Sequence, residues 1–270
     1  MHSSTDPSPG SGAAPYIRIA QVGKTYESRR GPVHALEGID LEVARGEFVS
    51  ILGPSGCGKS TLLKCVGGLE TVSSGRIEVA GAGVSRSPEN MGIVFQRDVL
   101  LDWRTVLDNV LVVAELRGLD PRRLRDRALE LLRLFGLERF TDRYPWELSG
   151  GMRQRASICR ALLVDPELLL MDEPFGALDA MTRDELNLEL RRMWMETHKT
   201  ILFITHSVTE AVYLSDRIVV MSRNPGRVAE IIDVDLPQHR PLSLRGEPGF
   251  SRLTGRIFAM FSSMGILKGD

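Results

Sequence analysis

The chain has 270 residues, of which 43% are hydrophobic and 26% are charged, and its formal net charge is −1. This composition is ordinary for a globular protein with a sizeable core, and the near-zero charge gives no electrostatic reason to expect a nucleic acid or an anionic membrane surface as partner. No apolar run approaches the roughly 20 residues that a membrane span needs, so any membrane would have to be crossed by another chain.

Residues 1–15 are rich in Ser, Pro and Gly and lack the basic and apolar stretches of a secretion signal, so we predict a flexible tail. Cys57, Cys65 and Cys159 are odd in number and lack the spacing of metal ligands. We therefore predict that they are small, buried free thiols in a reducing compartment, and not parts of disulfides or of a zinc site.

Short apolar strands alternate with helical patterns along the chain. We expect strands over residues 16–21, 41–52 (broken by a turn at 45–47), 76–79, 92–95, 167–171, 200–205 and 217–221. Helices are expected over 59–66, within 105–140, after 150, from 182 through 195 and over 208–214. Asp120 and Gly136 punctuate one of these helices, and Thr182 with Glu185 predicts a capping box for another. The alternation favours a parallel sheet with helices on both faces, into which the helical stretch from 97 to 160 is inserted.

A glycine-rich loop lies between a predicted strand and a predicted helix. Its residues fit the pattern G-x-x-x-x-G-K-[ST]: Gly53, Pro54, Ser55, Gly56, Cys57, Gly58, Lys59, Ser60 and Thr61. Glycines let backbone N–H groups point at phosphate oxygens, and the helix N-terminus adds a partial positive charge. Lys59 would reach the β- and γ-phosphates of a nucleotide, and Ser60 would ligate Mg²⁺. A glycine-rich turn with a chance lysine is the alternative, which the flanking strand and helix disfavour.

Two acids follow the apolar strand at 167–171. Ligands bind at the carboxyl ends of strands in open α/β sheets, which is where Asp172 and Glu173 would lie. Asp172 would hold Mg²⁺, and Glu173 would act as general base toward the attacking water. Alone, such a pair is more simply a solvated acidic turn, but beside the phosphate loop it predicts a P-loop NTPase.

The segment Leu148-Ser149-Gly150-Gly151-Met152 precedes this acidic pair. With it, the chain resembles the ATP-binding-cassette (ABC) ATPases, whose signature is LSGGQ and which have glutamine where this chain has Met152. Ser149, Gly150 and Gly151 at a helix start would form a second anion cradle and a helix N-cap at once. The resemblance implies a head-to-tail dimer, in which this cradle faces the γ-phosphate bound by a second copy.

Four further positions match the family one by one. Tyr26 corresponds to the aromatic that stacks on adenine, against the alternative of a tyrosine packed on the sheet at a strand end. Gln96 corresponds to the glutamine that senses Mg²⁺ and the γ-phosphate near the permease, and Asp179 to the loop that crosses to the partner subunit. His206 corresponds to the histidine that positions the general base, against the alternative of a structural histidine. The resemblance thus implies catalytic roles for Glu173, His206, Gln96 and Lys59, and a competent hydrolase.

The resemblance also implies the architecture. We expect the α/β fold of a P-loop NTPase: a RecA-like core sheet, a small antiparallel β subdomain and an inserted α-helical subdomain at about 97–160. The ATPase domain would span 16–236, and a C-terminal extension, to which no fold feature can be assigned, would span 237–270.

At finer detail the chain resembles importer ATPases for nitrate, aliphatic sulfonates and taurine, through the phosphate loop, residues 171–179 and 210–221, and the Asn224-Pro225-Gly226 turn. It departs from them at Asp102, before Trp103, where they have proline near the permease groove. Expected ligands are ATP and Mg²⁺. Expected partners are a second copy, membrane permease subunits and, indirectly, a solute-binding protein, with the chain at the cytoplasmic face of the cell membrane and no nucleic acid.

Three alternatives remain beside this interpretation. The ATPase of an exporter or lipid carrier would share every catalytic residue. A translation or DNA-maintenance factor would usually carry two cassettes or a long coiled coil, and this chain has one phosphate loop and no sustained heptads. A regulatory module without turnover is disfavoured by Glu173 and His206.

Overall fold

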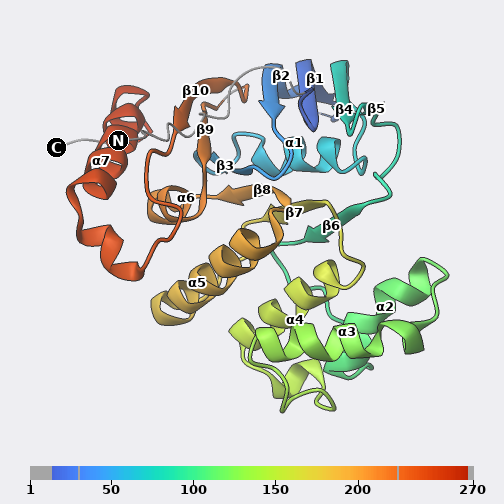
Figure 1. Ribbon diagram of the computed structural model, residues 1–270. Coiled ribbons are helices and arrows are strands. Elements are labelled where there is room, and N and C mark those ends of the chain that lie inside the picture. Colours follow the sequence, from blue (N-terminus) through green and yellow to red (C-terminus); the bar gives the residue numbers. More distant parts are fainter. Residues whose placement is uncertain (1–13, 30, 224, 267–270) are drawn as a thin grey trace, which may run out of the picture.

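The computed structural model describes residues 14–29, 31–223 and 225–266, and it contains two sheets (Figure 1). The antiparallel sheet has the order β2-β1-β4-β5, formed by β2 (Val33–Val43), β1 (Ile17–Tyr26), β4 (Ser74–Val79) and β5 (Ala82–Gly83). The larger sheet has the order β10-β9-β3-β8-β7-β6, formed by β10 (Val228–Asp233), β9 (Arg217–Met221), β3 (Phe48–Leu52), β8 (Thr200–Thr205), β7 (Leu168–Asp172) and β6 (Met91–Val94). All its pairings are parallel except that of β10 with β9.

The register of the central strands brings their carboxyl ends to one edge. Strands β3, β7 and β8 are almost wholly buried, as their continuous apolar sequences predict for strands covered on both faces. Leu52 pairs with Thr205, and Asp172 pairs with Ile204. The segments that follow these three strands therefore begin side by side, which assembles the site described below.

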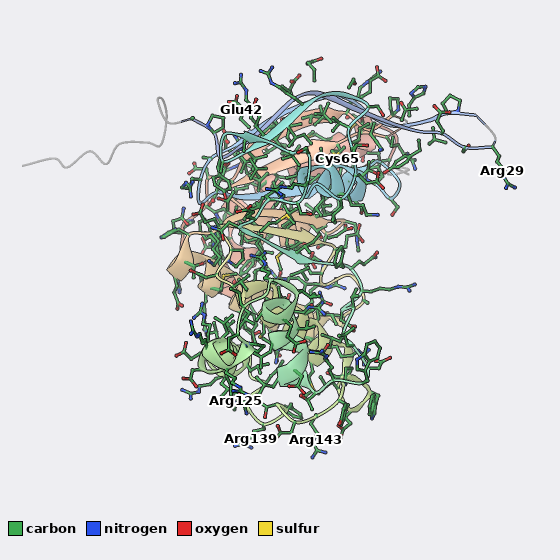
Figure 2. The ribbon with its side chains drawn as sticks, turned by 90° about the vertical axis from the view of Figure 1, so that its right-hand side faces the viewer. Arg29, Glu42, Cys65, Arg125, Arg139 and Arg143 are labelled. Carbon is green, nitrogen blue, oxygen red and sulfur yellow. The ribbon has the colours of Figure 1, made fainter. Side chains whose placement is uncertain are left out.

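Helix α1 (Lys59–Val66) lies between the two sheets, and α5 (Ala180–Thr197) and α6 (Val208–Leu214) cover the other face of the larger sheet (Figure 1). A separate helical body is formed by α2 (Val106–Leu116), α3 (Pro121–Leu134), η1 (Pro145–Glu147) and α4 (Gly150–Leu162). Figure 2 shows Arg125, Arg139 and Arg143 at the end of the molecule formed by this body, far from Glu42 on the antiparallel sheet. Cys57, Cys65 and Cys159 are buried free thiols, as expected.

The segment after β10 folds onto the larger sheet and the helices that cover it. It forms η2 (Leu242–Gly246) and α7 (Pro248–Ser263), and Phe250, Ile257 and Phe261 join the same hydrophobic cluster as the sheet and α5. The buried Arg240 donates hydrogen bonds to three backbone carbonyls at the end of α6. The extension is thus held by both apolar burial and helix capping.

Several local features differ from the expectations. The capping box at Thr182 is wrong: α5 begins at Ala180, and its N-cap is Asp179, whose carboxylate accepts a hydrogen bond from the Thr182 N–H at 3.0 Å. Aspartate is a better N-cap than threonine, and its extended backbone (φ −65°, ψ 163°) suits that position. Strand β10, helix α7 and the part of β2 before Leu41 were not expected. Residues 1–13 of the predicted tail, and Asn224, lie outside the described residues.

Among the helices of the described ranges, not one combines the length and the apolar character that a bilayer crossing requires.

Candidate active site

A cleft of about 410 Å³ lies at the carboxyl ends of the parallel strands. Its lining combines the phosphate loop, two acidic or amide side chains and a rim from β2 and the turn before β10: Ser55, Gly56, Gly58, Lys59, Ser60, Thr61, Gln96, Glu173, Val33, His34, Ala35 and Gly226. The last four residues were not predicted from the sequence. Gly226 is held there by backbone hydrogen bonds with Ala35 and Glu37, which are remote in sequence.

The loop's glycines are required by its shape. Gly58, the N-cap of α1, has φ +93°, and a Cβ there would lie 2.7 Å from the carbonyl oxygen of Ala35. A Cβ on Gly53 would lie 2.8 Å from the carbonyl oxygen of Met221. Larger residues would therefore push the loop away from its neighbours, and the curl that presents N–H groups to an anion would be lost.

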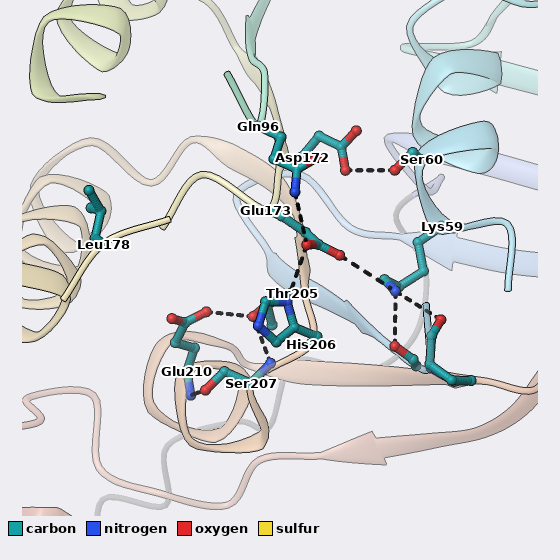
Figure 3. A network of polar contacts seen from close by, with 12 residues as sticks. Lys59, Ser60, Gln96, Asp172, Glu173, Leu178, Thr205, His206, Ser207 and Glu210 are labelled. Atoms are coloured by element: carbon teal, nitrogen blue, oxygen red, sulfur yellow. Dashed lines mark hydrogen bonds and ion pairs between the residues drawn. The ribbon is translucent and has the colours of Figure 1, made fainter. Parts of the chain in front are cut away.

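Lys59 is nearly buried, with 4% of its side chain exposed. Its Nζ donates hydrogen bonds to the carbonyl oxygens of Gly53 (2.9 Å) and Pro54 (3.2 Å) and lies 3.7 Å from Glu173 Oε1. The ammonium group is thus held inside the loop's curl and facing the acid (Figure 3).

Ser60 and Asp172 meet across the same edge, where Ser60 Oγ donates a hydrogen bond to Asp172 Oδ1 at 2.8 Å. Burial raises the pKa of the Asp172 carboxyl, the Ser60 hydrogen bond lowers it, and the nearby charge of Glu173 raises it further. A partly buried carboxylate beside a hydroxyl and a second carboxylate is an oxygen donor set that suits Mg²⁺.

Glu173 lies at the centre of the polar network in Figure 3. Its φ of +45° is in the left-handed region, and its N–H donates to the carbonyl of Ile204 on the adjacent strand at 3.0 Å. This unusual backbone turns the carboxylate toward both partners: Oε2 is 3.2 Å from His206 Nδ1 and 3.5 Å from Gln96 Nε2. The structure therefore brings together Lys59, Gln96, Glu173 and His206.

The signature residues lie elsewhere in the same chain. Ser149 is the N-cap of α4 and accepts a hydrogen bond from the Met152 N–H at 3.3 Å, as expected. A Cβ on Gly151 would lie 2.5 Å from Cγ2 of Thr182, so α4 and α5 touch there. Within the described part of the chain, the residues lining the cleft include neither Ser149, Gly150, Gly151 nor Asp179.

Tyr26 is at the end of β1, where Lys24 Nζ lies 4.7 Å from its ring centroid. It is not among the described residues that line the cleft. A larger groove of about 1110 Å³ lies at the amino-terminal side of the strands, between residues such as Arg45, Trp194 and Asp233. Of the residues that the structure describes, those lining this groove include neither the phosphate loop nor any predicted site residue. The smaller cleft is therefore the candidate active site.

The protein-family model described as "ABC transporter" matches residues 36–176 of this chain. The taurine import ATP-binding protein TauB of Rhizobium johnstonii is 44% identical over 92% of this chain and 97% of its own length. The aliphatic sulfonates import ATP-binding protein SsuB of Bacillus cereus is 39% identical over 93% of this chain and 98% of its own length. A solved dimeric ATP-binding cassette, in a post-hydrolysis state with ADP and Pi, superposes with a TM-score of 0.73 at 32% identity, covering 82% of this chain and 100% of that one.

The chain belongs to the family of ABC transporter ATP-binding proteins. The predicted family resemblance and the α/β cassette fold are confirmed, and the protein is an ATPase.

Proposed function

We propose that this protein is the ATP-hydrolysing subunit of an importer for a small organic sulfonate such as taurine. It acts as a homodimer beneath a separate membrane permease, at the cytoplasmic face of the cell membrane, and a solute-binding protein delivers the solute to that permease. The observation that carries the proposal is that Lys59 and His206 both contact Glu173, which lines the cleft. The chain in which they do so is 44% identical to a taurine import ATP-binding protein along nearly its whole length.

The cleft is proposed to bind ATP by its phosphates. Residues 53–61 surround the phosphate oxygens with N–H groups, and Lys59 leaves its carbonyl partners for the β- and γ-phosphates. Ser60, Asp172 and Gln96 are the residues that would hold Mg²⁺, which neutralises phosphate charge when it is bound.

Hydrolysis is assigned to the Glu173 carboxylate as general base. It takes a proton from the water that attacks the γ-phosphorus, while the bond between that phosphorus and the bridging oxygen breaks. His206 holds the carboxylate in line through the contact between Nδ1 and Oε2 and bonds the γ-phosphate with its other ring nitrogen. Most of the acceleration comes from positioning and charge stabilisation.

A second copy is proposed to complete each site. The cradle formed by Ser149, Gly150 and Gly151 lies outside the cleft of its own chain, so it is free to cover the γ-phosphate bound by a partner. Asp179 belongs to the loop that crosses between the copies, and Tyr26 stacks on adenine after a side-chain adjustment. The similar solved cassette is a dimer, which supports this arrangement.

Movement is proposed to pass to the permease through the helical insertion. ATP contacts favour the closed dimer, and loss of the γ-phosphate after hydrolysis releases it. Gln96 connects β6 to this body, and Trp103, with 74% exposure, lies in the segment where Asp102 replaces the proline of similar importers. The permease would therefore contact a locally altered groove.

The proposal is tested by deleting the gene in its native host and supplying taurine or an alkyl sulfonate as the only sulfur source. Growth should fail, return with the wild-type gene and stay absent with Glu173→Gln. Membranes solubilised in mild detergent should yield the tagged protein with a multi-spanning permease in near-equal amount. Growth unaffected by the deletion would refute the proposed solute class, and purely ribosomal or DNA-bound partners would transfer the ATPase to the non-transport class.

A further inference from the structure

The turn that carries His206 is fixed from its other side by a buried carboxylate. Thr205 Oγ1 donates a hydrogen bond to Glu210 and accepts one from the Ser207 N–H at 2.9 Å (Figure 3). These two hydrogen bonds fix the orientation of the Thr205 hydroxyl group. The backbone on both sides of His206 is therefore attached, through Thr205, to Glu210.

Glu210 in turn faces an arginine of the neighbouring helix. Glu210 is only 5% exposed, and its Oε1 lies 3.4 Å from Nε of Arg183 on α5. Arg183 also donates a hydrogen bond from Nη2 to the carbonyl oxygen of Leu178, at 2.8 Å. Leu178 immediately precedes Asp179, the N-cap of α5.

Leu178 lies beside the signature of the same chain. A Cβ added to Gly150 would be 3.8 Å from Leu178 Cδ2, so the two residues are close neighbours. A continuous set of contacts thus runs from the His206 turn through Glu210 and Arg183 to the segment beside the signature.

Burying this carboxylate is costly. Desolvation is the main cause that raises the pKa of Glu210, and the Thr205 hydrogen bond and the charge of Arg183 offset it only in part. A well-packed apolar pair at such a position would often be as stable or more stable, so the charges contribute orientation more than stability.

We propose that Glu210 is a positioning residue for ATP hydrolysis, which holds the His206 turn in register with the Leu178–Asp179 turn through Arg183. The inference deepens the proposed function and depends on the roles assigned there to Glu173 and His206. Glu210 does not touch the nucleotide cleft, so its removal should slow turnover and leave nucleotide binding intact.

The test compares Glu210→Gln, Arg183→Gln and the double variant in steady-state phosphate release and in direct ATP binding. Each single variant should lose about tenfold or more in kcat, with the ATP dissociation constant within about twofold of wild type. Because both residues belong to one chain of contacts, the double variant should be no slower than the slower single variant. Should Glu210→Gln fail to fold, Arg183→Gln, whose side chain is 29% exposed, carries the same prediction.

Lys199→Gln is the matched control. Lys199 is 8% exposed and pairs with Asp165 at 2.7 Å, just before the first residue of β8, so its loss removes an ion pair at the opposite end of the same strand. This variant should melt earlier and keep its kcat. A wild-type kcat in both Arg183→Gln and Glu210→Gln would overturn the proposal. It would also be overturned if the kcat losses of the two single variants multiplied in the double variant and the kcat of every variant, the control included, fell in step with its melting temperature. Glu173→Gln, run in parallel, separates the two ideas: activity there would refute the general-base assignment itself.

Discussion

Oε2 of Glu173 and Nδ1 of His206 are 3.2 Å apart, although 33 positions separate the two residues in the sequence. They meet because β7 and β8 are parallel neighbours that end at one edge, and because Glu173 adopts a left-handed backbone. The carboxylate is 19% exposed while the imidazole is 51% exposed. An acid shielded in this way and oriented by a solvent-facing histidine is well placed to accept a proton from water at the cleft.

Glu173→Gln should retain ATP binding but lose at least about 100-fold in hydrolysis, because the amide cannot accept the water's proton. Retained nucleotide should also favour an ATP-dependent dimer, visible as a shift in size-exclusion chromatography. Phosphate release measures the first effect. Turnover near the wild-type rate in this variant would exclude Glu173 as the base.

Ser149→Arg should bind ATP about as tightly as wild type and lose turnover by about 100-fold or more, if the signature acts on the nucleotide of the other copy as proposed. Ser251→Arg makes the same change on the exposed face of α7 and serves as control. Equal activity of the two variants would contradict a site shared between copies.

Gly151→Ala should destabilise the protein by about 1–3 kcal/mol, because the new methyl group would lie 2.5 Å from Cγ2 of Thr182. Thr182→Ser removes that methyl group and should restore most of the lost stability. Gly255→Ala on α7 should instead stabilise by about 0.5–1 kcal/mol, because the new methyl group would have only its own helix backbone and chain neighbours within 4 Å. Chemical denaturation measures all three, and additive losses in the double variant would show that α4 and α5 do not touch there.

Asp172→Asn should raise the melting temperature at neutral pH, measured without nucleotide or Mg²⁺, while it impairs hydrolysis. Burial raises the folded-state pKa of Asp172, so the wild-type carboxyl favours folding fully only below its unfolded pKa and loses that contribution as pH rises through the folded pKa. The advantage of the asparagine variant should therefore shrink as pH falls through the raised folded-state pKa, and it should be gone below the unfolded pKa of about 4. An advantage that is independent of pH would point to packing.

The central elements could be predicted because their sequences carry strong local signals. The expected strand at 200–205 and helices at 59–66 and 208–214 match the observed bounds, since continuous apolar runs and a glycine-rich loop leave few other solutions. Residues 53–61, Asp172, Glu173 and His206 could be placed near one another because parallel strands end together.

Other features depend on contacts that a local pattern does not encode. Exposed residues alternate with more buried ones along β10, which lies at the sheet edge, and α7 contains Gly, Ser and Pro. Each element is therefore stabilised by distant partners more than by its own propensity. Gly226 in the cleft wall and Arg183 beside Glu210 are likewise positioned by chain segments remote in sequence. The domain boundaries and the functional roles of the site residues stay predictions.

The end of α6 has a consequence for protein engineering. Arg240 donates to the carbonyls of Val212, Tyr213 and Ser215, while Arg191 donates to those of Leu214 and Gln238. A chimaera in which only the segment after β10 came from another cassette would lose the Gln238 carbonyl. The buried Arg191 guanidinium would then lack this hydrogen-bond acceptor. Helices α5 and α6 and the segment after β10 therefore form one structural unit that is discontinuous in sequence, and they have to be exchanged together.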